Sequence, residues 1–227
     1  MGMKGEVVHD DSTWVVKSHY PLVMQNAETF RSNKTFICVR NPLDVFPSYA
    51  NLVNTLSHGN KLSFELHEDW PEWWSWWVKK QTSVMKRFFK VLVDETITQG
   101  TNPLYIVRYE DLVLQPKETL MSLFCFLLDA DSLEGTTTER RIDEVVAMGK
   151  GASAVYNLKS TTGLLNMHES KYSPELRSYV QSELAEMIHY FGYAKVDGQE
   201  NPTGFFEFPE AKPEFIKLQN KFRMDSE

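Results

Sequence analysis

The feature that most limits how this chain can fold is an apolar run that passes directly into a helix start. Residues 35–39 are mostly β-branched or aromatic and predict a buried strand. Asn41 suits the cap of a following helix, Pro42 its first turn, and Asp44 its electropositive end. The sequence therefore predicts a strand followed at once by a helix that runs to about Ser57.

Two further apolar runs, residues 13–17 and 104–109, predict additional strands. Helical patterns separate the later two strands, so we expect a parallel arrangement. The predicted helices beyond the first cover residues 69–98, 116–128, 139–148 and 174–191, the last ended by Gly192. Alternating strands and helices predict an α/β fold, with a parallel β-sheet flanked by helices.

The longest predicted helix carries the tryptophans of the chain's middle region. Trp70, Trp73, Trp74 and Trp77 fall on one stripe, which predicts core packing against the sheet. Trp76 falls off that stripe, and two interpretations stay open for it: the lining of an acceptor pocket, or a partner surface.

Length and composition favour one globular unit. The 227 residues are 42% hydrophobic, enough for a sizeable core. We predict a domain over residues 1–196 and an aromatic tail, residues 197–227, which packs on the domain or on a partner.

The net charge of -7 disfavours a nucleic-acid surface. No run is long enough for a membrane span. Cys38 and Cys125 are predicted to be buried free thiols, which favours a reducing, cytoplasmic location.

Polar side chains gather where the predicted strands end. Arg40 follows the strand at 35–39, and Ser48 lies two turns along the next helix, so both could hold an anion. The alternative is that Arg40 forms an ion pair with Asp44. Lys17 and His19 follow the first predicted strand and suit a charge stabiliser and a base.

Three segments, in this order, resemble the sulfotransferase family. They are Lys17-Ser18-His19-Tyr20-Pro21, Arg40-Asn41-Pro42-Leu43-Asp44 with Ser48, and Tyr109-Glu110-Asp111-Leu112 with Pro116. Each is weak alone, and the three together are specific. The resemblance covers about residues 15–126, and beyond them only a helix that ends in Phe-Gly-Tyr matches.

The resemblance implies a reaction and a role for each matching residue. The co-substrate would be 3'-phosphoadenosine 5'-phosphosulfate, and no metal would be needed. His19 would be the base for a hydroxyl or amine acceptor, on a small molecule or a carbohydrate, and Lys17 would stabilise the sulfuryl oxygens. Arg40 and Ser48 would hold the 3'-phosphate of the nucleotide, and Tyr109 would lie near the adenosine.

The sequence departs from the family pattern in three places. Nothing before Thr13 matches the first strand and its Pro-Lys-Ser-Gly-Thr-type phosphate loop. The late Arg-Lys-Gly loop has only Lys159 as a candidate substitute, and Pro47 lies beside Ser48. We therefore expect a P-loop-like sulfotransferase fold that lacks its first strand and phosphate loop.

Two functions stay open at this point. The chain is either a sulfotransferase or an inactive scaffold subunit that has lost the loop, and we expect little transfer by the chain alone. The sheet position left open by the missing strand would be covered by a second copy of the chain or by an assembly partner.

Overall fold

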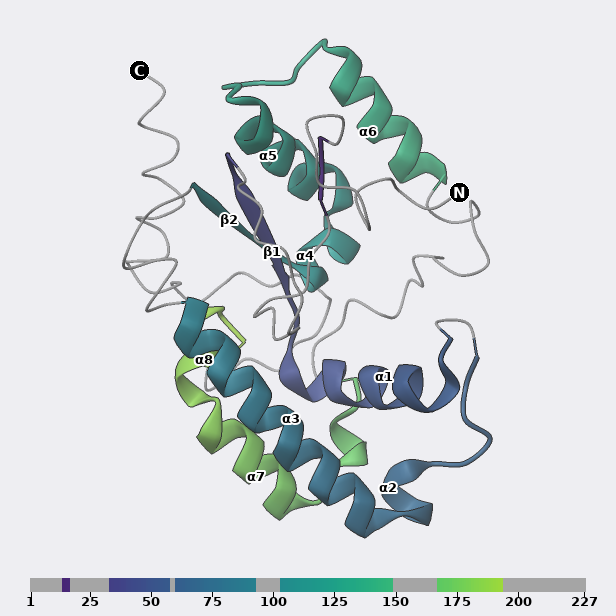
Figure 1. Cartoon of the computed structure of the whole chain (residues 1–227). Coiled ribbons are helices and arrows are strands. Elements are labelled where there is room, and N and C mark those ends of the chain that lie inside the picture. The colour runs from purple at the N-terminus through teal and green to yellow at the C-terminus, as the bar shows by residue number, and fades with distance from the viewer. Residues whose placement is uncertain (1–13, 17–32, 58–59, 93–102, 149–166, 194–227) are drawn as a thin grey trace, which may run out of the picture.

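The computed structural model, shown in Figure 1, describes residues 14–16, 33–57, 60–92, 103–148 and 167–193. Within these ranges, strands β1 (Thr35–Val39) and β2 (Leu104–Arg108) pair in parallel. Thr35 lies opposite Leu104, and Val39 lies opposite Arg108. The α/β class with a parallel sheet is confirmed. The second strand ends one residue earlier than predicted, because Tyr109 begins a helix.

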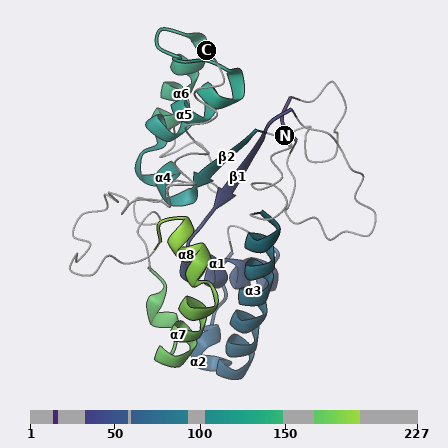
Figure 2. The same cartoon turned by 90° about the vertical axis from the view of Figure 1, so that its left-hand side faces the viewer.

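Helices make up most of the described chain. They are α1 (Pro42–Thr55), α2 (Leu66–Asp69), α3 (Pro71–Val91), α4 (Tyr109–Leu114), α5 (Pro116–Leu128), α6 (Thr137–Met148), the 3-10 turn η3 (Glu169–Lys171), α7 (Pro174–Glu183) and α8 (Ala185–Tyr190). Figures 1 and 2 place α5 and α6 on one side of the strands, and α1, α2, α3 and α7 together on the other. None of the described helices has the length and apolar character needed to cross a bilayer.

The helix predicted at 174–191 is two helices. Leu184 leaves helical geometry at φ -109° and ψ 15°, and it is 1% exposed. The bend lets α7 pack with α1 and α3 while α8 packs beside the strands. The predicted stop at Gly192 is confirmed: Gly192 has φ +72°, and Tyr193 N donates to Ile188 O at 2.7 Å, the bonding of a Schellman cap.

The buried apolar residues form two clusters. The helical cluster joins α1, α3 and α7 and consists of Leu43, Phe46, Ala50, Trp74, Trp77, Val78, Tyr172, Leu176, Val180 and Leu184. The sheet cluster joins the strands, the end of α3 and the region of α8, and consists of Val39, Phe89, Leu92, Leu104, Ile106, Met187, Tyr190, Phe191 and Tyr193. Helix α3 therefore contributes to both clusters.

The predicted tryptophan stripe is only partly right. Trp74 and Trp77 are buried, but they pack in the helical cluster and not against the sheet. Trp70 precedes α3 as its capping residue and is 58% exposed, so it does not belong to the stripe. Trp76 is exposed, as its position off the stripe predicts, and Lys80 lies over its ring.

Two other expectations need correction. Residues 14–16, the described part of the first predicted strand, lie outside any strand, and Trp14 stacks on Phe124 of α5 with ring centroids 6.2 Å apart. This ring contact is with a single helix, and Trp14 is 67% exposed. Cys38 and Cys125 are free, but Cys38 is exposed because it shares the outward face of β1 with Phe36.

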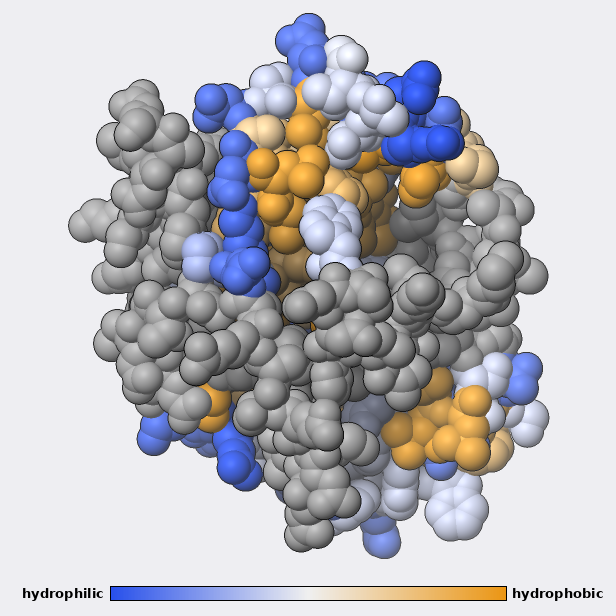
Figure 3. All heavy atoms as spheres, turned by 45° about the horizontal axis from the view of Figure 1, so that its top comes forward, coloured by the Kyte–Doolittle hydropathy of each residue, from blue (hydrophilic) through white to orange (hydrophobic). Residues whose placement is uncertain are grey.

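Apolar side chains also reach the surface on the face that carries α5 and α6. Figure 3 shows them among hydrophilic groups on this side of the molecule. The exposed large apolar side chains of these helices are Leu128, Val145 and Met148. The predicted covering of the sheet by a partner stays a prediction, and residues 197–227 lie outside the described ranges.

Pro47 lies inside α1 without ending it, and a tyrosine compensates for the donor that it lacks. In a regular helix the N-H at position 47 would bond to Leu43 O, and proline has no N-H. Tyr172 O-H donates to this carbonyl oxygen at 3.0 Å, and Tyr172 is buried. The tyrosine thus fixes the segment before α7 to the first turn of α1.

Tyr172→Phe is expected to lower the free energy of unfolding by about 1–3 kcal/mol, because Leu43 O would be left buried without its donor. The loss should shrink in a Pro47→Ala background, where residue 47 has an N-H to donate. Urea denaturation of both single variants and the double variant measures this coupling. An equal loss in the two backgrounds would contradict the compensation.

Candidate anion-binding site

The ends of the two strands bring two of the predicted site residues together. Val39 pairs with Arg108, so the next residues, Arg40 and Tyr109, leave the sheet side by side. The guanidinium carbon of Arg40 lies 4.5 Å from the centroid of the Tyr109 ring. This contact is a cation-π interaction, which orients the guanidinium group without using its N-H donors.

Arg40 has an unused donor. Its Nε is buried and has no hydrogen-bond partner among the residues that the structure describes. The alternative ion pair with Asp44 is not present there, and Asp44 Oδ1 accepts a hydrogen bond from His168 N at 3.1 Å. Because a buried donor without an acceptor costs free energy, Arg40 is suited to an acceptor from a ligand.

The start of α1 directly follows Arg40. Asn41 Oδ1 accepts from Leu43 N at 3.1 Å, which confirms the predicted cap. Helix α1 has 14 residues, and the start of such a helix favours negative charge. Ser48 lies further along α1, is exposed, and makes no side-chain hydrogen bond to the described residues. Its predicted role with Arg40 stays a prediction.

Glu110 connects the start of α1 to the residue that follows Gly192. No role was predicted for it from the sequence. It is 4% exposed. Its Oε1 accepts from Asn41 N at 3.0 Å, and its Oε2 accepts from Tyr193 O-H at 2.9 Å. Burial raises the pKa of Glu110, while the bonds from Asn41 and Tyr193 act in the opposite direction. An acidic residue two positions after a buried strand was the available signal.

Arg108 forms a second connection at the same junction. Its Nε and Nη2 donate to the two carboxylate oxygens of Asp111 at 2.7 and 2.8 Å. Its Nη1 donates to Phe191 O at 3.3 Å. Burial lowers the pKa of Arg108, and the Asp111 carboxylate opposes that shift. The paired guanidinium therefore joins the end of β2 to the end of α8.

Three predicted site residues, Lys17, His19 and Lys159, lie outside the described ranges. Their proposed roles are therefore untested by the geometry. Among the residues that are described, no group of His, Cys, Asp and Glu side chains could hold a metal ion.

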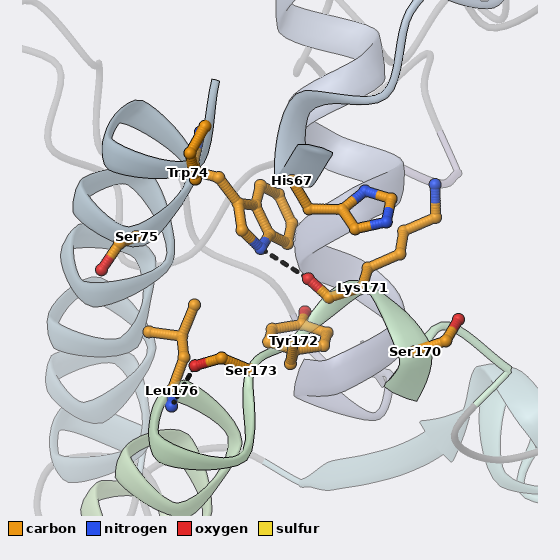
Figure 4. Close-up of a pocket in the computed structure, with 9 residues that line it drawn as sticks. His67, Trp74, Ser75, Ser170, Lys171, Tyr172, Ser173 and Leu176 are labelled. Atoms are coloured by element: carbon orange, nitrogen blue, oxygen red, sulfur yellow. Dashed lines mark hydrogen bonds between the residues drawn. The ribbon is translucent and has the colours of Figure 1, made fainter. Parts of the chain in front are cut away.

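A separate cleft of about 340 Å³ lies between the start of α3 and the start of α7 (Figure 4). Trp74 Nε1 donates across it to Lys171 O at 2.8 Å, and Ser173 Oγ accepts from Leu176 N at 3.2 Å. The Lys171 ammonium pairs with Glu65. These polar groups already have partners within the chain. Trp74 and not Trp76 lines the cleft, so the role of Trp76 stays open.

His168 precedes η3, and its backbone N-H donates to the buried Asp44. Burial lowers the pKa of His168, and Lys171 and Arg40 lower it further, while Asp44 and Glu65 oppose the shift. The neutral imidazole is therefore favoured in the folded protein. Its contribution to stability is present above the unfolded pKa of about 6.5 and is lost as the pH falls through the folded pKa.

An NMR titration of the imidazole C-H signals should place the midpoint of His168 below 6.5. His168→Gln assigns the signal, because the chain has 6 histidines. The stability advantage of wild type over His168→Gln should decrease as the pH is lowered from about 7.5 to about 5.5. A midpoint at or above 6.5 would contradict the burial of the ring.

Comparison with protein families assigns the chain to a class. Residues 4–148 match the sulfotransferase domain. The match spans more than half of the chain, and the chain belongs to the sulfotransferase family. This family transfers sulfuryl groups from a donor co-substrate to acceptor molecules. Comparison with curated proteins and with solved structures gives no match. Tyr193 lies beyond the matched residues, so part of the network around Arg40 comes from outside them.

Proposed function

We propose that the chain binds 3'-phosphoadenosine 5'-phosphosulfate and transfers its sulfuryl group to a hydroxyl or amine of a small-molecule or carbohydrate acceptor. The observation that carries the proposal is the Arg40 guanidinium, whose Nε is buried without a partner among the described residues while its face rests on Tyr109. A guanidinium with free N-H groups can bind two oxygens of one phosphate.

The surroundings of Arg40 support a nucleotide phosphate. The chain carries a net charge of -7, so an anion must be attracted by local groups and not by the protein as a whole. Arg40 and the start of α1 are such groups. Tyr109 offers an aromatic surface beside them, which suits the adenosine part of the same ligand.

The chemical roles rest on residues carried over from the family resemblance. The donor, when bound, supplies the activated sulfuryl group, and 3',5'-adenosine bisphosphate leaves as the bond from sulfur to the 5'-phosphate oxygen breaks. His19 takes the proton of the acceptor hydroxyl, and Lys17 neutralises charge on the sulfuryl oxygens. Ser48 and Lys159 add donors to the 3'-phosphate. We expect the protein to act in the cytoplasm, with no metal ion in the reaction.

Calorimetric titration with 3',5'-adenosine bisphosphate tests the binding site, with adenosine 5'-monophosphate as the matched ligand that lacks the 3'-phosphate. The bisphosphate should bind, and the monophosphate should bind at least about tenfold more weakly, because it loses a charge-assisted contact. No binding at millimolar bisphosphate, or equal affinities for the two ligands, would contradict the proposal.

The second candidate function is an inactive scaffold, which would bind the nucleotide without transferring sulfate. Transfer of labelled sulfate from the donor to a panel of phenols, alcohols and amines separates the two functions. Transfer that disappears in His19→Ala supports the enzyme. Bisphosphate binding without transfer to any acceptor favours the scaffold.

A further inference from the structure

We infer that Glu110 and Tyr193 together position Arg40 for the nucleotide phosphate. This inference rests on the proposed function, because it assigns to Glu110 a role in the same site. Glu110 is a positioning residue here: it acts on the ligand through the backbone that carries Arg40.

Glu110 holds the backbone next to Arg40 through a bond to Asn41. Glu110 Oε1 accepts from Asn41 N at 3.0 Å, and this N-H belongs to the peptide bond that joins Arg40 to Asn41. Asn41 O also accepts from Asp44 N and Val45 N at 3.0 and 2.9 Å. The turn between β1 and α1 is therefore fixed on both sides of the Asn41 α-carbon.

The position of Glu110 in the chain links it to the Arg40 side chain as well. It directly follows Tyr109, the residue on which the Arg40 guanidinium rests. Residues 109 and 110 therefore hold Arg40 in two ways. The ring of Tyr109 contacts the Arg40 side chain, and the carboxylate of Glu110 accepts from the backbone N-H that follows Arg40. A shift of this segment would move both contacts together.

Glu110 is itself held in place by Tyr193. Its other oxygen, Oε2, accepts from Tyr193 O-H at 2.9 Å. Tyr193 is 5% exposed and is held by the turn at Gly192, where Tyr193 N donates to Ile188 O. The carboxylate is therefore oriented by a rigid, buried donor, and its two oxygens serve two different parts of the chain.

A carboxylate this close to a phosphate site needs a reason. The negative charge of Glu110 would repel a bound anion. Its presence is therefore explained by the hydrogen bonds that it accepts. Asn41 N-H donates to one of its oxygens, and Tyr193 O-H donates to the other. Glutamine keeps an acceptor oxygen for Asn41 N while removing the charge. Alanine removes both the acceptor oxygen and the charge.

The test is calorimetric titration of the full chain with 3',5'-adenosine bisphosphate. Glu110→Ala should bind about 10- to 100-fold more weakly than wild type, because it frees the backbone at Arg40. Glu110→Gln should stay within about threefold of wild type, since its amide oxygen can accept from Asn41 N. Tyr193→Phe should bind roughly three- to tenfold more weakly.

Tyr190→Phe is the matched control, because it removes a hydroxyl from another buried tyrosine of the sheet cluster that does not bond to Glu110. It should bind like wild type. All titrations are run well below the lowest thermal midpoint, so that only folded protein is measured. If Glu110→Ala does not fold, Tyr193→Phe and Glu110→Gln decide the result.

The outcomes separate this inference from the proposed function. Wild-type binding that does not depend on Arg40 contradicts the proposed function, and the inference with it. Arg40-dependent binding with full affinity in Tyr193→Phe overturns the inference alone. So does a Glu110→Gln variant that binds as weakly as Glu110→Ala, because the retained acceptor would then have no effect.

Discussion

Arg40→Ala is expected to weaken the binding of 3',5'-adenosine bisphosphate by roughly 10- to 100-fold, the effect of losing charge-assisted hydrogen bonds to a phosphate. The guanidinium Nε is already buried and lacks a partner among the described residues. Within the described residues, Nε therefore gives up no hydrogen bond when the ligand binds, so that most of the interaction contributes to affinity. Calorimetric titration at fixed ionic strength measures the change.

Two variants control for charge. Arg40→Lys keeps the positive charge but loses the planar fork and the contact with Tyr109, so its affinity should lie between those of wild type and Arg40→Ala. Arg141→Ala removes the same charge from an exposed side chain that pairs with Glu144 on α6, and it should leave the affinity unchanged. Equal weakening by Arg40→Ala and Arg141→Ala would show that net charge alone is responsible.

Phe46→Ala is expected to have the largest effect on stability, a decrease of about 3–5 kcal/mol in the free energy of unfolding. Phe46 is 2% exposed and belongs to the helical cluster. It lies on α1, so the cavity left by its ring would loosen the helix that follows Arg40. Urea denaturation monitored by tryptophan fluorescence measures the loss.

Phe64→Ala is the matched control for Phe46→Ala. It deletes the same ring from a position that is 41% exposed, where water already contacts part of the side chain. Its cost should be about 1 kcal/mol or less. Similar losses for the two variants would mean that α1 is not held by the packing described above.

Local chemistry was sufficient to predict where three of the described helices begin. Asn41 caps α1, Pro116 opens α5 and Pro174 opens α7. In each case the signal lies within a few residues of the helix end, because a cap satisfies backbone groups of the first turn. The parallel pairing of the later two strands was predicted for a similar reason, since helices separate them.

The features that were predicted wrongly depend on packing between distant residues. Trp70 has helical spacing from Trp74 but lies before the helix and is exposed. At the bend at Leu184, α7 packs in the helical cluster and α8 packs in the sheet cluster. The spacing of apolar residues along one segment cannot show that its two halves pack in different clusters. At the site, Arg40 and Tyr109 were predicted and lie together. Glu110 was missed because its partners are 69 and 83 residues away in the chain.

The separation of these partners also determines when the site can form during folding. Thr35 pairs with Leu104, so the strands can join only after a long segment has been closed into a loop, at a cost in chain entropy. Contacts between distant residues are typically made late. Helices α1 and α3 can form earlier from local contacts. A chain emerging from the ribosome can therefore build helical structure long before Glu110 meets Tyr193, and the capacity to bind an anion should be among the last properties that it acquires.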